Sequence, residues 1–193
     1  MPVCVSVSRV VLCSAALLAV ASCGGGGDDP PANSAPPPGS SPPPQVTATC
    51  GHADFVNQVL LRVNQRRAQG ASCGAQGSFG PAPALAWNNL LTQAAAAHSQ
   101  DMATNNFFSH TGSNGSTMAQ RVTATGYDWS SLAENIAAGQ TSIQQVVDGW
   151  MASPGHCANI MNANYQQVGV ACVPGTAGST YSSYWTMNLA RPR

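Results

Sequence analysis

The chain has 193 residues, of which 7% are charged, and its seven arginines balance seven acidic residues. It has no lysine, and Glu134 is its only glutamate. A neutral chain without a basic run cannot displace counterions from phosphates, so the composition argues against a nucleic-acid partner. It also argues against electrostatic docking to anionic lipids.

The N-terminus predicts an exported protein. Residues 1–22 place Arg9 before an apolar run that is too short to span a bilayer comfortably, which is typical of a signal peptide. The run ends in Val20-Ala21-Ser22-Cys23, which resembles a bacterial lipobox. We therefore expect lipid on Cys23 to anchor the protein at the bacterial cell envelope, in the outer membrane or at the cell surface. The alternative is ordinary cleavage with Cys23 merely near the site.

A low-complexity segment follows the cysteine. Residues 23–48 contain four consecutive glycines and two proline triplets and have little apolar surface to bury, so we expect a disordered tether. The remaining residues, 49–193, are predicted to form one globular domain.

Hydrophobic periodicity predicts helices through most of this domain. The first begins just after Cys50 and stops at Gly70, with Arg66 and Arg67 in its last turn, where basic side chains suit the helix dipole. Further helices are expected at about 88–104, 118–124 and 142–152. Ser153-Pro154 reads as an N-cap and first helical residue, opening a short helix that runs to Met161.

Strands are expected at the C-terminal end. Residues 168–172 and 185–189 alternate in hydrophobicity around a Pro-Gly turn, which predicts a strand pair. Helices followed by strands indicate the α+β class.

Four cysteines lie in the domain: Cys50, Cys73, Cys157 and Cys172. Export favours disulfides, and a zinc site is the weaker alternative because no pair has the close spacing of structural zinc ligands. Of the three possible pairings, we expect the sequential one, Cys50–Cys73 and Cys157–Cys172. Each bridge would contribute roughly 3 kcal/mol in the chain-entropy view.

Three histidines and the single glutamate are the candidate chemical groups. His98 lies on an apolar helix face and is interpreted as a hydrogen-bonded core residue. His110 in a loop and His156 at a helix start occupy positions that more often carry function. Glu134 lies in an apolar segment and needs a partner, whereas His52 is expected to be exposed. Such a set suits a metal site, an acid–base pair or a structural polar network, and the residues alone leave all three open.

Eight short motifs in order resemble the CAP superfamily of cysteine-rich secretory, antigen 5 and pathogenesis-related 1 proteins, in its bacterial branch. The resemblance covers about residues 52–191 and implies an α-β-α sandwich with an antiparallel sheet between helical layers. The motifs are Asn64-x-x-Arg67, Leu85-Ala86-Trp87, His98-Ser99-x-x-Met102, Phe107-Phe108-Ser109-His110, Ala133-Glu134-Asn135-Ile136-Ala137, Trp150-Met151-Ala152-Ser153-Pro154-Gly155-His156, Asn159-Ile160-Met161 and Val168-Gly169-Val170.

The resemblance implies a cleft that contains His110, Glu134 and His156. Ser153 stands where the family has a second acidic residue, which leaves one carboxylate and argues against tight metal binding. Some members hold a divalent ion such as zinc, for which His110 and His156 are the candidate ligands here; no cofactor is required.

We therefore expect a monomeric, non-enzymatic binding module for a small-molecule or lipid ligand. The alternative is a hydrolase of peptide, ester or cell-wall substrates using the same cleft, with Ser109 or Ser153 as helper. A purely structural envelope protein is the third interpretation.

Overall fold

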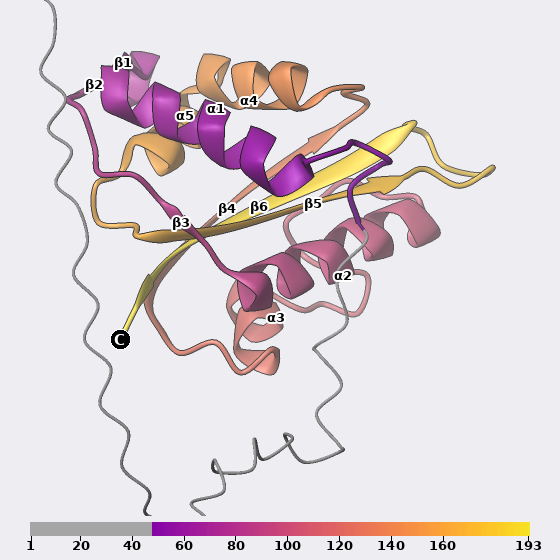
Figure 1. Cartoon of the computed structure of the whole chain (residues 1–193). Coiled ribbons are helices and arrows are strands. Elements are labelled where there is room, and N and C mark those ends of the chain that lie inside the picture. The colour runs from indigo at the N-terminus through magenta and orange to yellow at the C-terminus, as the bar shows by residue number, and fades with distance from the viewer. Residues whose placement is uncertain (1–47) are drawn as a thin grey trace, which may run out of the picture. The chain divides into compact units, whose positions relative to one another are not determined.

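A computed structural model describes residues 48–193 as a layered α+β domain (Figure 1). The predicted signal peptide, the predicted lipidation site Cys23 and nearly all of the predicted tether lie outside these residues. Three helices cover one face of the sheet and two cover the other, so the expected α-β-α sandwich is confirmed. Among the described residues, no helix is both long and apolar enough to cross a membrane.

The central sheet has the strand order β3-β5-β6-β4. The predicted C-terminal pair forms its centre, as β5 (Gln167–Pro174) and β6 (Ser183–Pro192) run antiparallel. β4 (Trp129–Ala138) pairs antiparallel with β6 and is an edge strand. The expectation of an antiparallel sheet holds except at the other edge, where the two-residue β3 (Ala86–Trp87) runs parallel to β5. A separate small ribbon joins β1 (Ala71–Ser72) to β2 (Ser78–Phe79) around a 3-10 turn, η1 (Gly74–Gln76).

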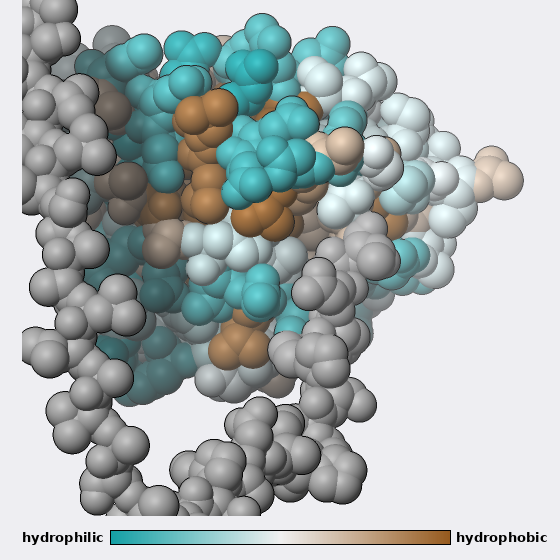
Figure 2. Space-filling view, in the orientation of Figure 1, coloured by the Kyte–Doolittle hydropathy of each residue, from teal (hydrophilic) through white to brown (hydrophobic). Residues whose placement is uncertain are grey.

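One helical layer consists of α1 (Phe55–Gln69), α4 (Ile143–Ala152) and α5 (Pro154–Met161). The apolar positions of α4 are buried as its periodicity predicts. α5 begins with proline at its first position, but Ser153 makes no side-chain capping bond. On the face that carries α1, hydrophobic residues form brown patches separated by teal ones (Figure 2), and Val56 and Leu61 are exposed there.

Arg67 corrects the sequence-based interpretation of the end of α1. Its guanidinium is fully buried and donates to the carbonyls of Pro83, Ile160, Asn162 and Tyr165. A buried cation requires such acceptors, because an unpaired one would be strongly destabilising. Arg67 therefore joins the end of α1 to the segment that follows α5, and only Arg66 lies at the surface, paired with Asp148.

The other layer consists of α2 (Asn89–Asn105) and α3 (Met118–Ala124). The Asn88 side chain caps α2 by accepting from the amides of Leu90 and Leu91, and Asn106 ends the helix in the left-handed conformation. α3 begins with a capping box in which Thr117 and Gln120 satisfy each other's amides. The loop between the helices is therefore held at both ends.

The predicted disulfide pairing is wrong. Cys50 is bonded to Cys172 and Cys73 to Cys157. The two bridges span 122 and 84 residues, respectively, instead of closing short loops. The backbone explains the first bridge, since Cys172 N–H donates to the Ala48 carbonyl and Cys50 N–H donates to the Cys172 carbonyl. The start of the domain therefore lies against the central strand β5, and the bridge fixes it there.

Candidate functional site

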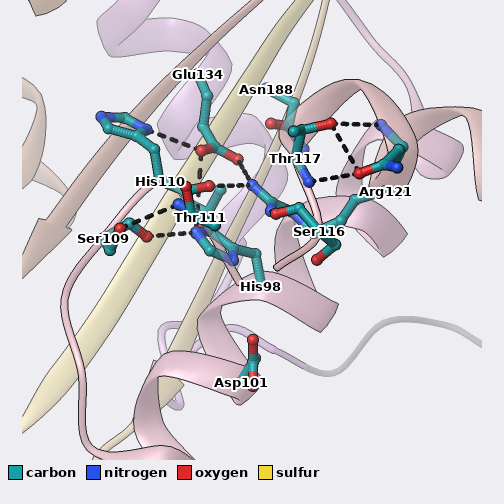
Figure 3. Close-up of polar contacts among 12 residues, drawn as sticks. His98, Asp101, Ser109, His110, Thr111, Ser116, Thr117, Arg121, Glu134 and Asn188 are labelled. Atoms are coloured by element: carbon teal, nitrogen blue, oxygen red, sulfur yellow. Dashed lines mark hydrogen bonds and ion pairs between the residues drawn. The ribbon is translucent and has the colours of Figure 1, made fainter. Parts of the chain in front are cut away.

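The site is organised around Glu134, whose side chain is only 3% exposed. Glu134 lies on β4, where side chains alternate between the two helical layers. Its neighbours at two-residue steps, Leu132 and Ile136, pack in the cores on the α2 and α3 side. The strand therefore directs the carboxylate toward α2, α3 and the loop between them (Figure 3).

Arg121 is the partner that the isolated glutamate requires. Its Nη2 lies 2.7 Å from Glu134 Oε2, and its side chain is 9% exposed. The same guanidinium donates to the carbonyls of Ser116 and His110 at 2.9 and 3.1 Å. Arg121 thus joins α3, the preceding loop and β4 through one charged group (Figure 3).

His110 donates to the other carboxylate oxygen. Its Nδ1 lies 2.9 Å from Glu134 Oε1, and because a carboxylate only accepts, Nδ1 carries the proton. The imidazole side chain is 56% exposed. In the neutral ring, Nε2 then has a free lone pair, so the carboxylate fixes both the tautomer and the orientation of this histidine.

His98 lies beneath this pair, fully buried on α2. Its Nε2 is 2.9 Å from the Ser109 carbonyl, to which it donates, and 3.9 Å from Glu134 Oε1. It is a buried, hydrogen-bonded residue, as the sequence suggested, yet it also supports the loop that presents His110. Its Nδ1 is buried without a partner among the described residues.

Glu134, Arg121, His110 and His98 form one polar cluster. Within it, the neighbours of Glu134 oppose the effect of burial on the pKa of its carboxyl. Burial raises the pKa of its carboxyl, but the hydrogen bond from His110 and the charge of Arg121 outweigh it, so the pKa lies below 4.5. Burial lowers the pKa of His98 below 6.5, an effect that the nearby Glu134 charge opposes. At neutral pH the cluster therefore holds an ionised glutamate and a neutral His98.

His156 lies in the other helical layer, in the first turn of α5. Its backbone carbonyl accepts from Asn135 Nδ2 at 3.1 Å, and Asn159 donates to Asn135 Oδ1 at 2.9 Å. Asn135 follows Glu134 on β4, so two adjacent residues of this strand are hydrogen-bonded to the two opposite helical layers. Burial and the nearby charge of His110 both lower the pKa of the His156 imidazole.

The predicted site residues divide between two pockets along β4. His110 and Glu134 line one of about 380 Å³, together with Thr111, Thr117, Met118 and Ala119. Ser153 and His156 line the other, which is beside α4. His52, expected to be exposed, is half-buried and packs against Trp185 with ring centroids 5.7 Å apart.

The sequence reasoning missed Arg121. A signal was available, because Glu134 demands a partner and Arg121 is the only basic residue between Arg67 and Arg191. The predicted helix over 118–124 contains it, but no local pattern indicates that this helix packs beside Glu134.

The donor set does not complete a metal centre. Both carboxylate oxygens of Glu134 are engaged, one by His110 and one by Arg121. Within residues 48–193, no group of three or more His, Cys, Asp or Glu side chains is placed to hold a metal ion. The imidazoles of His110 and His156 therefore remain as a two-ligand set, short of the three protein ligands of a catalytic zinc site.

The described structure also offers no activated serine. Ser109 Oγ accepts from the Thr111 amide, and within residues 48–193 neither the Ser109 hydroxyl nor the Ser153 hydroxyl is hydrogen-bonded to an imidazole. A serine nucleophile needs a base within hydrogen-bond reach. The oriented His110 ring can accept or donate a proton, or bind a ligand through Nε2.

The family comparison matches residues 60–189 to the model described as CAP: Cysteine-rich secretory protein family. A Bacillus subtilis relative, uncharacterized protein YkwD, is 33% identical over 102 residues, which are 53% of this chain and 37% of that protein.

Solved structures agree. An extracellular protein containing an SCP domain from Bacillus anthracis is 32% identical with a TM-score of 0.51, covering 57% of this chain and 34% of that one. An outer surface protein from Borrelia burgdorferi is 20% identical with a TM-score of 0.52, covering 58% of this chain and 80% of that one, and shows the fold alone. The chain thus spans little more than a third of the length of the Bacillus proteins.

Proposed function

The chain belongs to the cysteine-rich secretory protein (CAP) family, and on that premise we propose that it is an exported, non-enzymatic binding module. Its ligand is a small molecule that lies along β4, where His110 lines one pocket and His156 the other. The observation that carries this proposal is the pairing of both Glu134 oxygens, with His110 on one side and Arg121 on the other. This arrangement fixes an imidazole for contact but brings no nucleophile to it.

The pairing argues for ligand recognition because both oxygens of the Glu134 carboxylate already have hydrogen-bond partners. A buried carboxylate with two charge-assisted partners is rigid. It is therefore suited to positioning His110 and unsuited to taking up a proton near neutral pH, since its pKa is lowered. A rigid, oriented imidazole beside a pocket is a preorganised hydrogen-bonding group for a ligand.

A divalent ion is the second candidate ligand. Glu134 accepting from His110 Nδ1 is the outer-shell arrangement that orients a histidine toward a metal. Since His110 and His156 would be the only two protein ligands, we expect weak zinc binding. Calorimetry with zinc chloride tests this, and His110→Ala and His156→Ala should each abolish it.

Turnover separates the binding module from the alternative hydrolase. The purified chain is incubated with p-nitrophenyl acetate, a peptide library and cell-wall fragments, beside a His156→Ala variant whose fold is checked by circular dichroism. We expect no turnover above the variant's background. Turnover that disappears in folded His156→Ala would overturn the proposal and establish the hydrolase.

The export and anchoring proposal rests on the N-terminal sequence. The extracellular Bacillus anthracis protein among the similar structures supports export, and the Val20-Ala21-Ser22-Cys23 motif supports lipid on Cys23. In a bacterial host, the wild-type chain should fractionate with membranes and carry a lipid detectable by mass spectrometry. Cys23→Ser should be released, and equal membrane association of this variant would refute the anchor.

A further inference from the structure

A pocket of about 310 Å³ between α4 and the end of β4 suggests what the ligand is. Besides Ser153 and His156, its lining contains Phe108, Ile136, Ala137, Ala138, Gln140, Val146, Gly149, Trp150 and Tyr181. The volume is at the lower end of the range for small-molecule sites. Four features of this lining bear on its occupant: a glycine, an unpaired amide oxygen, the lack of charge and the aromatic rings.

Gly149 lies in the interior of α4, where glycine is less favourable than alanine because it loses more conformational entropy on folding. It is not among the glycines with positive φ, so its backbone does not require glycine. A Cβ built on it would meet nothing within 4 Å. No contact of the described fold accounts for the missing side chain, whereas an occupant lying against the helix backbone would.

Gln140 supplies a hydrogen-bonding group that the protein leaves unused. Its Oε1 is buried and has no partner among the described residues. Its backbone carbonyl is held by Ser183 Oγ and Trp185 Nε1 at 2.7 and 3.0 Å, so the residue is fixed beside the pocket. A buried, unpaired acceptor is destabilising, and turning the Gln140 amide toward an O–H or N–H group of a ligand in the pocket would relieve that cost.

The pocket selects against charged ligands. Its lining contains no Asp, Glu, Lys or Arg. An ion entering this pocket would lose hydration without meeting an opposite charge, so the occupant is uncharged.

Aromatic rings border the same pocket. Phe108 and Tyr181 are 45% and 39% exposed, with ring centroids 6.0 Å apart, whereas Trp150 is buried. Exposed rings beside a pocket offer flat apolar surfaces together with polar edges. They suit a ligand that combines C–H faces with hydrogen-bond donors.

We propose that this pocket binds an uncharged sugar ring, with its face over Gly149 and the aromatic rings and a hydroxyl or amide donor toward Gln140. The inference rests on the proposed binding function and names its ligand class. N-acetylglucosamine is the probe, since it is uncharged and offers hydroxyl donors, an amide N–H and an apolar methyl group. Hexanol is the comparison probe for a purely apolar occupant with one hydroxyl.

The test measures binding of both probes by calorimetry to the purified chain and three variants. Gly149→Ala places a methyl group in the pocket, and Gln140→Leu removes the acceptor. Gly155→Ala is the matched control, because Gly155 is a helical glycine with nothing within 4 Å of its Cβ position and does not line the pocket. Thermal unfolding of each variant is recorded in parallel.

We expect saturable binding of N-acetylglucosamine that weakens at least tenfold in Gly149→Ala and Gln140→Leu and persists in Gly155→Ala. Gly149→Ala should lose binding while its melting temperature rises, which separates ligand contact from damage to the fold. Unchanged binding in Gly149→Ala, or binding of hexanol without the sugar, would overturn the sugar assignment. The broader binding function would fail separately, through turnover that depends on His156.

Discussion

Replacing Arg121 by methionine tests the electrostatic core of the site. The guanidinium and the Glu134 carboxylate are 9% and 3% exposed and 2.7 Å apart, so the substitution leaves a buried carboxylate with one partner instead of two. Removing one member of a buried pair costs about 3–5 kcal/mol. Two hydrogen bonds to loop carbonyls are lost as well, whereas the bond from His110 remains and limits the loss. We expect a net destabilisation of about 3–5 kcal/mol.

The assay is urea unfolding at neutral pH of wild type, Arg121→Met, Glu134→Gln and the double variant. The double variant should be more stable than the sum of the single losses predicts, by about 1–3 kcal/mol, because the unpaired charge is gone. An Arg121→Met loss below about 1 kcal/mol, or additive effects, would refute the reasoning.

The lowered pKa of Glu134 also predicts how the stability loss of Arg121→Met depends on pH. The pKa of Glu134 in the fold lies below 4.5, so its contribution to stability is present above pH 4.5 and is lost as the pH falls through the folded value. Arg121 contributes to that lowering. The difference in stability between wild type and Arg121→Met should therefore shrink in acid, and a difference that stays constant would contradict the pairing.

Three other predictions concern His98, the Cys50–Cys172 bridge and Gly149. Because the pKa of His98 in the fold is below 6.5, stability should begin to fall as the pH drops below 6.5, and urea midpoints of His98→Gln should show a weaker decline; equal declines would contradict this. Replacing Cys50 and Cys172 by alanine should cost about 2–5 kcal/mol in chemical unfolding, since their bridge spans 122 residues; an unchanged midpoint would argue against the bridge. Gly149→Ala should stabilise the chain by about 0.5–1 kcal/mol, and a lower melting temperature would show that the fold requires this glycine.

Much of the fold could be predicted because its signals are local. The apolar stripe of α4 and the alternation of β5 and β6 each fix an element from its own residues. β4 was not predicted as a strand, since its central residues, Ala133 to Ala138, are rich in alanine and show no clear alternation. Its conformation depends on pairing with β6, which is a non-local interaction.

The disulfide pairing and the contacts of Arg67 could not be predicted from local sequence patterns. The expected sequential pairing joins cysteines that are near in the chain, whereas the topology places Cys50 beside Cys172 through main-chain bonds between the domain start and β5. Arg67 suited a helix end by its position, yet the packing of α1 buries it among carbonyls far along the chain. These partners depend on tertiary packing that no single segment encodes.

The candidate site likewise combines one residue that the local sequence indicates with partners that depend on tertiary packing. Glu134 could be singled out because an isolated carboxylate in an apolar segment needs a partner. That His110 and Arg121 would take one oxygen each required the placement of α3 and its preceding loop against β4. The separation of His156 and Ser153 into a different pocket depends on the packing of α4 and α5 beside β4.

The most direct test of a binding cleft without catalysis is an NMR titration of the imidazole signals of His110 and His156 with N-acetylglucosamine. The account predicts a saturable shift of the His156 signals, since this ring lines the sugar pocket, while the sugar stays chemically unchanged. Histidine signals that do not move at saturating sugar, or a sugar that is converted during the titration, would contradict it.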